Sequence, residues 1–155
     1  MRGKKAPKRK IKPDLKFNRI DIGRFINYLM QDGKKTVAQG IIYDCFDYIS
    51  EKTKQDAVEI FDAALCNVSP SLEVKGRRIG GANYQVPMVV SSERKMQLCY
   101  RWLIEAASKK KGKPMYIKLG EELMSAANNE GDAIKKKLDV HKMAEANRAF
   151  AHFAR

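Results

Sequence analysis

The stretch VKGRRIGGANYQVP, residues 74–87, holds the side chains whose types and spacing best suit contact with an anion. Arg77 and Arg78 precede a pair of glycines, and Asn83 and Tyr84 follow that pair. Guanidinium groups bind phosphate, glycine allows close approach of the backbone to a ligand, and an aromatic ring can stack on a base. The stretch therefore predicts contact with a nucleic-acid strand, although a plain turn with solvated arginines would use the same glycines.

The charge of the whole chain favours the nucleic-acid interpretation. The 155 residues include 31 Lys and Arg against 18 Asp and Glu, a formal net charge of +13. So basic a domain repels itself unless an anionic partner neutralises it, and nucleic acid is the common polyanion. The basic residues are spread over several segments instead of one face of an amphipathic helix, which argues against a membrane surface. A basic surface that only keeps the protein soluble is the remaining alternative.

No set of residues has the spacing of an active site. His141 and His152 are the only histidines, and His141 shares a helix face with Glu145, but a third ligand or a nucleophile is missing. The motifs of nucleotide hydrolysis, dinucleotide binding and serine hydrolysis are absent from the sequence. We therefore expect no catalytic residue, no bound metal, no cofactor and no enzyme activity, with His141 making an ordinary hydrogen bond.

Cysteine usage and the N-terminus indicate the compartment. Cys45, Cys66 and Cys99 are odd in number and form no CxxC pair, so neither a disulfide framework nor a zinc finger is predicted. All three have apolar neighbours, and we expect core thiols in a reducing environment. The sequence has no apolar secretory signal and no apolar run near the roughly 18 residues of a membrane helix. We expect an intracellular protein that is not a membrane protein.

The first 13 residues, MRGKKAPKRKIKP, differ in composition from the rest of the chain. They carry seven Lys or Arg residues, two prolines and almost no apolar residue. Such a segment cannot bury a core, so we expect an extended basic arm over 1–13 that orders only against an anionic partner. A solvated, disordered tail is the alternative. The helical domain is then expected over 14–155.

Apolar residues recur at the spacing of amphipathic helices over most of the chain. Thr36 is placed to cap the second helix and Asp56 the third, while Trp102 lies off the apolar stripe of the fourth and is expected at the edge of the core. The predicted helices cover residues 22–30, 36–50, 57–69, 92–110, 114–127 and 132–155. The predicted inward residues of the second, third and fourth helices are Val37, Ile41, Cys45, Tyr48, Ile49, Val58, Phe61, Leu65, Val68, Met96, Cys99, Tyr100, Leu103 and Ala107.

After Pro70, at about residues 72–90, the apolar residues no longer recur every 3.6 residues, as in a helix, but every second residue, as in a strand. LEVKGRR and YQVPMVV are short runs with β-branched and aromatic residues, and they flank IGGAN. This pattern is typical of a β-hairpin. The sequence therefore predicts a mainly α fold: a single six-helix domain, a protruding two-stranded hairpin between the third and fourth helices, and the basic arm.

Three stretches resemble the bacterial-type family of small-subunit ribosomal protein seven, in the order and spacing of that family. They are RFINYLMQDGKKTVA at 24–38, LEVKGRRIGGANYQVPMVV at 72–90 and KKKLDVHKMAEANRAFAHF at 135–153. The resemblance extends from about Pro13 to Phe153. The chain departs from the family at Gly76, at SSERK before the fourth helix and at the terminus AHFAR, so contacts of a terminal aromatic or a longer tail are not carried over.

The resemblance implies a protein that organises the 3′ major (head) domain of 16S-type ribosomal RNA in translation. It implies a place near the exit tRNA site and the messenger exit path, with small-subunit proteins nine, eleven and nineteen as partners, in cytoplasmic ribosomes and without homo-oligomers. Residues expected near tRNA or messenger are Arg78, Ile79, Gly80, Gly81, Ala82, Asn83 and Tyr84. Residues expected to bind rRNA are Arg2, Lys4, Lys5, Lys8, Arg9, Lys10, Lys12, Lys34, Lys35, Lys75, Arg77, Arg78, Arg94, Lys95, Lys109, Lys110, Lys111 and Lys113.

An architectural DNA-binding protein is the alternative on physical grounds. A β-ribbon on a helical body can also enter a minor groove and bend a duplex. Such ribbons carry an apolar wedge at the tip and act as symmetric dimers, whereas Ile79 is the only wedge candidate in this stretch. Preference for a folded RNA junction over duplex DNA at matched salt discriminates between the two.

Overall fold

The computed structural model of the chain describes residues 3, 6 and 11–154. Six of the predicted rRNA-binding residues of the arm therefore lie outside the described residues: Arg2, Lys4, Lys5, Lys8, Arg9 and Lys10. The chain separates into two compact units, residues 1–40 and 41–155, and each is described by itself. The domain boundary expected at residue 13 stays a prediction.

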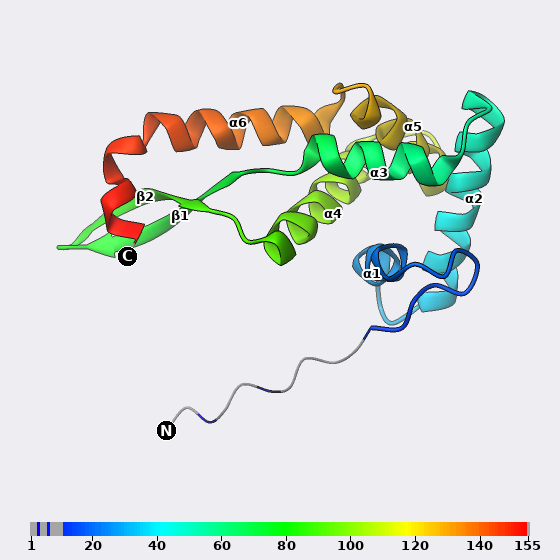
Figure 1. The fold of residues 1–155 in the computed structure, drawn as a ribbon, viewed down its shortest axis with the longest axis horizontal. Coiled ribbons are helices and arrows are strands. Elements are labelled where there is room, and N and C mark those ends of the chain that lie inside the picture. Colours follow the sequence, from blue (N-terminus) through cyan, green and yellow to red (C-terminus); the bar gives the residue numbers. More distant parts are fainter. Residues whose placement is uncertain (1–2, 4–5, 7–10, 155) are drawn as a thin grey trace. The chain divides into compact units, whose positions relative to one another are not determined.

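The mainly helical class and the position of the hairpin are confirmed (Figure 1). The two strands pair with each other as one antiparallel sheet between α3 and α4. Along the described residues the elements are α1 (Ile20–Leu29), α2 (Lys35–Thr53), α3 (Ala57–Val68), β1 (Leu72–Ile79), β2 (Ala82–Val89), α4 (Ser92–Lys109), α5 (Met115–Ala127), α6 (Asp132–Ala146) and the 3-10 helix η1 (Arg148–Ala154). None of the helices within that part of the chain is long and apolar enough to cross a membrane.

In the first unit, α1 buries the predicted apolar stripe. Ile22, Phe25 and Ile26 have almost no exposed surface. The chain before α1 packs closely on it, because a Cβ at Gly23 would come within 2.9 Å of the Lys12 carbonyl oxygen. Asp14 is buried there and accepts hydrogen bonds from the backbone N–H groups of the two residues at 16 and 17. Lys12 is one of the described residues of the predicted arm, and its backbone is thus part of the folded unit.

The face of α2 that is buried differs from the prediction. Val37 is 57% exposed, Ile41 and Tyr48 are half-buried, and the fully inward residues are Ala38, Ile42, Cys45, Phe46 and Ile49. Helix α2 carries two adjacent apolar stripes, and the local period cannot choose between them; a tertiary contact does. Phe46 packs on the Phe61 ring of α3, with 5.6 Å between the centroids. Thr36 also lies inside α2 and does not cap it, since the helix begins at Lys35.

Helices α3, α4 and α5 supply most of the core of the second unit. Phe61, Leu65 and Val68 of α3 are buried as predicted, as are Cys99, Tyr100, Leu103 and Ala107 of α4. Val58 and Met96 are only half-buried. Trp102 is 7% exposed and lines a hollow with Lys109 and Lys135, as expected of a ring at the edge of the core. Cys66 is exposed, so the prediction of three core thiols is wrong for that residue.

The predicted sixth helix is too long. Helix α6 ends at Ala146, and the chain continues as the 3-10 helix η1. Asn147 ends α6 because its side-chain amide donates to the Met143 carbonyl oxygen at 2.8 Å, taking up one of the last carbonyl groups of the helix. The turn redirects the residues after it toward the hairpin, where η1 contacts β2.

Candidate nucleic-acid interface

The hairpin, called here the ribbon (residues 72–89), ends in a two-residue turn. Ile79 pairs with Ala82, so Gly80 and Gly81 form the turn, and both have positive φ, 57° and 93°. Positive φ at both central positions is the geometry that matches the twist of a hairpin and that glycine adopts without strain. In Figure 1 the ribbon extends beyond the ends of α3 and α4, which places the turn away from the core of its unit.

The register of the ribbon sorts the predicted contact residues into two faces. Arg77 pairs with Tyr84, and Arg78 pairs with Asn83. Because successive side chains of a strand point to opposite faces, Arg77 and Tyr84 share one face and Arg78 and Asn83 share the other. The two arginines that are adjacent in the sequence therefore cannot serve the same surface.

Arg78 and Asn83 form the open face of the tip. Both side chains are exposed, as are Gly80, Gly81 and Ala82. Within the described part of the chain, the Arg78 guanidinium lies in no ion pair or hydrogen bond. This face presents a cation, an amide and a turn without side chains, a combination that can contact a phosphate and the edge of a base.

Arg77 and Tyr84 form the opposite face, and η1 covers it. The Arg77 guanidinium donates to the Phe153 carbonyl oxygen at 2.8 Å. The Tyr84 ring lies 5.1 Å from the Phe150 ring and 5.7 Å from the Phe153 ring, between centroids. The residue that the sequence offers as a stacking platform for a base thus already packs, in tilted geometry, against two rings of the protein.

Two of the predicted cations share an acid at the base of the ribbon. Glu73 is buried, and its carboxylate lies 2.9 Å from Lys75 Nζ and 3.1 Å from Arg94 Nε. Burial alone would raise the pKa of Glu73, but the hydrogen bonds from Lys75 and Arg94 outweigh it, and the pKa lies below its ordinary value of 4.5. The three charges sum to one positive charge, so this group attracts an anion less than its two cations suggest.

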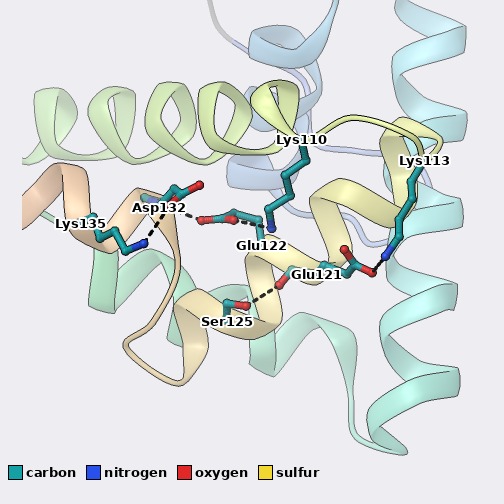
Figure 2. A network of polar contacts seen from close by, with 8 residues as sticks. Lys110, Lys113, Glu121, Glu122, Ser125, Asp132 and Lys135 are labelled. Carbon is teal, nitrogen blue, oxygen red and sulfur yellow. Dashed lines mark hydrogen bonds and ion pairs between the residues drawn. The ribbon is translucent and has the colours of Figure 1, made fainter.

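The basic run after α4 is also largely occupied by ion pairs (Figure 2). Lys109 pairs with Glu105 at 2.9 Å, Lys110 with Glu122 at 2.7 Å, and Lys113 with Glu121. Lys111 is exposed and, among the residues described, has no ion pair.

Glu122, in the middle of α5, connects the end of α4 to the start of α6. Its carboxylate has no exposed surface, accepts from the Ala133 N–H at 3.0 Å and meets Lys110 Nζ. Gly131 makes room for it, since a Cβ at that position would lie 2.8 Å from Glu122 Oε1. Lys110 therefore holds the end of α4 to α5 and to the start of α6, in addition to any contact with RNA.

The remaining residues that were predicted to bind rRNA are divided between the two units. Lys12, Lys34 and Lys35 are exposed in the first unit, where Lys34 and Lys35 flank the start of α2. Lys95, in the first turn of α4, is half-buried. Among the described residues, no three His, Cys, Asp or Glu side chains are grouped as metal ligands would be.

His141 makes an ordinary structural contact. Its Nε2 accepts from the Ser71 backbone N–H at 3.3 Å, which connects α6 to the start of β1. Burial, with the nearby Lys137 cation, lowers the pKa of His141 below its ordinary value of 6.5, so the neutral ring that can accept this bond is favoured.

Sequence reasoning missed the protein partners of the predicted cations. Phe150 and Phe153 were visible only as part of a helix pattern, although their spacing of three residues is the repeat of a 3-10 helix. Glu122 offered the signal of an acid within an otherwise apolar helix face, with Leu119 and Leu123, which in a basic protein indicates a buried ion pair. Glu73 offered no such signal, because its strand face also carries Lys75 and Arg77.

Comparisons with known proteins identify the family of the chain. The sequence model of the family described as Ribosomal protein S7p/S5e matches residues 1–148. The small ribosomal subunit proteins uS7 of Thermosipho africanus and of Thermotoga maritima are each 56% identical over 153 residues, which is 99% of either chain. The uS7 of Polynucleobacter necessarius is 51% identical over 98% of this chain and 97% of its own. The chain therefore belongs to the bacterial-type ribosomal protein S7 family: it is a structural, rRNA-binding constituent of the small ribosomal subunit, cytoplasmic in bacteria, and not an enzyme.

Proposed function

We propose that the protein organises the 3′ major (head) domain of small-subunit rRNA, and that its ribbon tip contacts RNA near the exit tRNA site and the messenger exit path. The observation that carries the proposal is the open face of the tip, where Arg78 and Asn83 flank the Gly80–Gly81 turn. A guanidinium beside a turn without side chains can approach a sugar-phosphate backbone closely. We infer that this backbone is RNA because the chain belongs to a family of rRNA-binding proteins.

Electrostatics explains how such a protein stabilises a folded RNA junction. RNA helices that meet at a junction bring their phosphates close together, and cations presented from protein loops lower this repulsion. Lys34 and Lys35 are exposed cations of the first unit, and Lys111 is an exposed cation of the second. Recognition is then mainly of RNA shape and backbone, with few contacts to base edges.

The arm and the protein neighbours complete the proposal. The predicted arm, residues 1–13, carries seven of the predicted cations, and we propose that it binds rRNA. Small-subunit proteins nine, eleven and nineteen are proposed as neighbours because the family resemblance implies them. The protein is proposed to act as a single copy in each subunit.

The test is competition between RNA and DNA. The full-length protein is bound to a transcript of the 3′ domain of small-subunit rRNA, and to duplex DNA of equal length, from about 50 to about 300 mM salt. We expect tight RNA binding that excess DNA does not displace, with a salt slope of several released counterions. Equal affinity for both polymers, lost with salt, would leave only a basic surface and favour the architectural DNA-binding alternative.

A further inference from the structure

We propose that η1 is a clasp that positions the ribbon tip, so that Arg77 and Tyr84 are positioning residues and the Arg78–Asn83 face makes the nucleic-acid contact. This inference rests on the proposed contact of the ribbon with RNA. It assigns different roles to adjacent residues of one motif, and it gives a role to Phe150 and Phe153.

The first reason is that the tip needs support. A two-stranded hairpin by itself is marginally stable in water. In this ribbon the buried residues, Glu73, Val86 and Pro87, lie in the half nearest the helices, whereas the positions from Gly80 to Asn83 are exposed. Without a further contact the distal half would sample many orientations, and ordering it on RNA would lower the affinity.

The second reason is that η1 supplies this contact with two kinds of interaction. The Tyr84 ring packs on the rings of Phe150 and Phe153 at centroid distances that are usual for aromatic pairs, 5.1 and 5.7 Å. The Arg77 guanidinium donates to the backbone carbonyl of Phe153 at 2.8 Å. The clasp therefore holds both strands of the ribbon, one through a ring and the other through a hydrogen bond.

The third reason is that the clasp leaves only one face of the tip for a ligand. Tyr84 and Arg77 are half-buried by η1, and a base or a phosphate could replace η1 only after it undocks. The paired residues on the other face, Arg78 and Asn83, are exposed. With η1 docked, RNA meets a preorganised tip through that second face.

The test compares three variants of the full-length protein on the same 3′-domain transcript. F150A/F153A removes the rings of the clasp and keeps the Phe153 carbonyl group. R78A removes the proposed phosphate contact. F17A is the matched control, because Phe17 is a half-buried phenylalanine of the first unit.

We expect R78A to weaken binding. It should also reduce the salt slope, which is the slope of log affinity against log salt concentration, by about one. We expect F150A/F153A to weaken binding by about three- to tenfold, the cost of ordering one or two side chains, with the salt slope unchanged because no phosphate contact is lost. F150L/F153L, which keeps apolar bulk on Tyr84, restores most of the affinity. F17A leaves both quantities unchanged.

A second measurement separates positioning from general stability. Amide hydrogen exchange of the free F150A/F153A protein should be faster at residues 76–85 and unchanged in the helices α3, α4 and α5. Faster exchange throughout the second unit would overturn the positioning role, because η1 would then support the whole fold.

The binding results separate failure of this inference from failure of the proposed function. If R78A weakens binding while F150A/F153A does not, the ribbon contacts RNA and the clasp inference alone is overturned. If F150A/F153A tightens binding, η1 competes with RNA for Arg77 and Tyr84, and the inference is again wrong. If neither variant changes binding, the ribbon is not an RNA contact, and the inference falls together with that part of the proposed function.

Discussion

Lys110 Nζ lies 2.7 Å from Oε2 of Glu122, a carboxylate with no exposed surface, although Lys110 belongs to the most basic run of the helical part of the chain. The Lys110 side chain itself is 31% exposed, so the pair reaches from the surface into the core. The charge density of a sequence therefore overstates the charge that is available to RNA.

Lys110→Met should lower stability, and Lys111→Met should not. The first change leaves the Glu122 carboxylate buried without its counter-charge, and breaking a buried pair in this way costs about 3 kcal/mol or more. Lys111 is exposed, and its removal should change only RNA affinity and the salt slope. Urea unfolding of the free proteins and RNA titration of both variants provide the measurements.

The double variant K110M/E122Q should regain part of the lost stability, because no buried charge is left uncompensated. Equal stability of K110M and the parent protein would contradict the role assigned to this pair.

Gly131→Ala should destabilise the protein more than Gly112→Ala. Both glycines have positive φ, 95° and 82°, where a side chain causes strain on the order of 1–3 kcal/mol. At Gly112 a Cβ meets nothing within 4 Å, whereas at Gly131 it would lie 2.8 Å from Glu122 Oε1 and would displace the carboxylate from the Ala133 N–H. Thermal melts of the two variants give the comparison. A smaller effect at 131 than at 112 would show that Glu122 can shift without loss.

Glu73→Gln should make the free energy of unfolding fall less steeply as the pH is lowered. The pKa of Glu73 in the folded protein lies below its ordinary value of 4.5, since hydrogen bonds from Lys75 and Arg94 outweigh the effect of burial. A carboxyl group with a lowered folded pKa adds stability above its unfolded pKa, and this stability is lost as the pH falls through the folded value. The parent protein should therefore lose stability below about pH 4.5 more steeply than the variant. Urea midpoints measured across that window give the slopes. Glu105→Gln, in an exposed pair, is the control and should change stability by less than about 1 kcal/mol.

His141 should titrate below its ordinary pKa of 6.5 in the folded protein, because burial and the Lys137 cation disfavour the imidazolium. A histidine with a lowered folded pKa adds stability above its unfolded pKa, and this stability is lost as the pH falls below about 6.5 through the folded value. The ring protons followed by NMR report the folded pKa directly. A His141 pKa above 6.5 would contradict the expected direction and would show that the fold does not favour the neutral ring.

The elements themselves could be predicted from the sequence because their signals are local. The stripe of Ile22, Phe25 and Ile26 predicts α1, and the change of period around the glycine pair predicts the ribbon and its turn. The choice of the buried face of α2 could not be predicted, since the local period does not distinguish its two apolar stripes and the inward Phe46 packs on Phe61 of α3. The end of α6 was missed for a similar reason: the pattern continues past Asn147, but the aromatic residues after it have partners in the ribbon.

The sequence by itself determined the class of fold, the net charge and the family, because composition, periodicity and long motifs are properties of the chain alone. The tertiary structure alone decided which cations remain for RNA. Glu73 lies 21 residues from Arg94, and Arg77 lies 76 residues from Phe153, so no local pattern contains these pairs. Register and packing bring them together, and the strand alternation then directs Arg77 to η1 and Arg78 to solvent. Which of two neighbouring arginines can meet a nucleic acid is therefore a consequence of the fold.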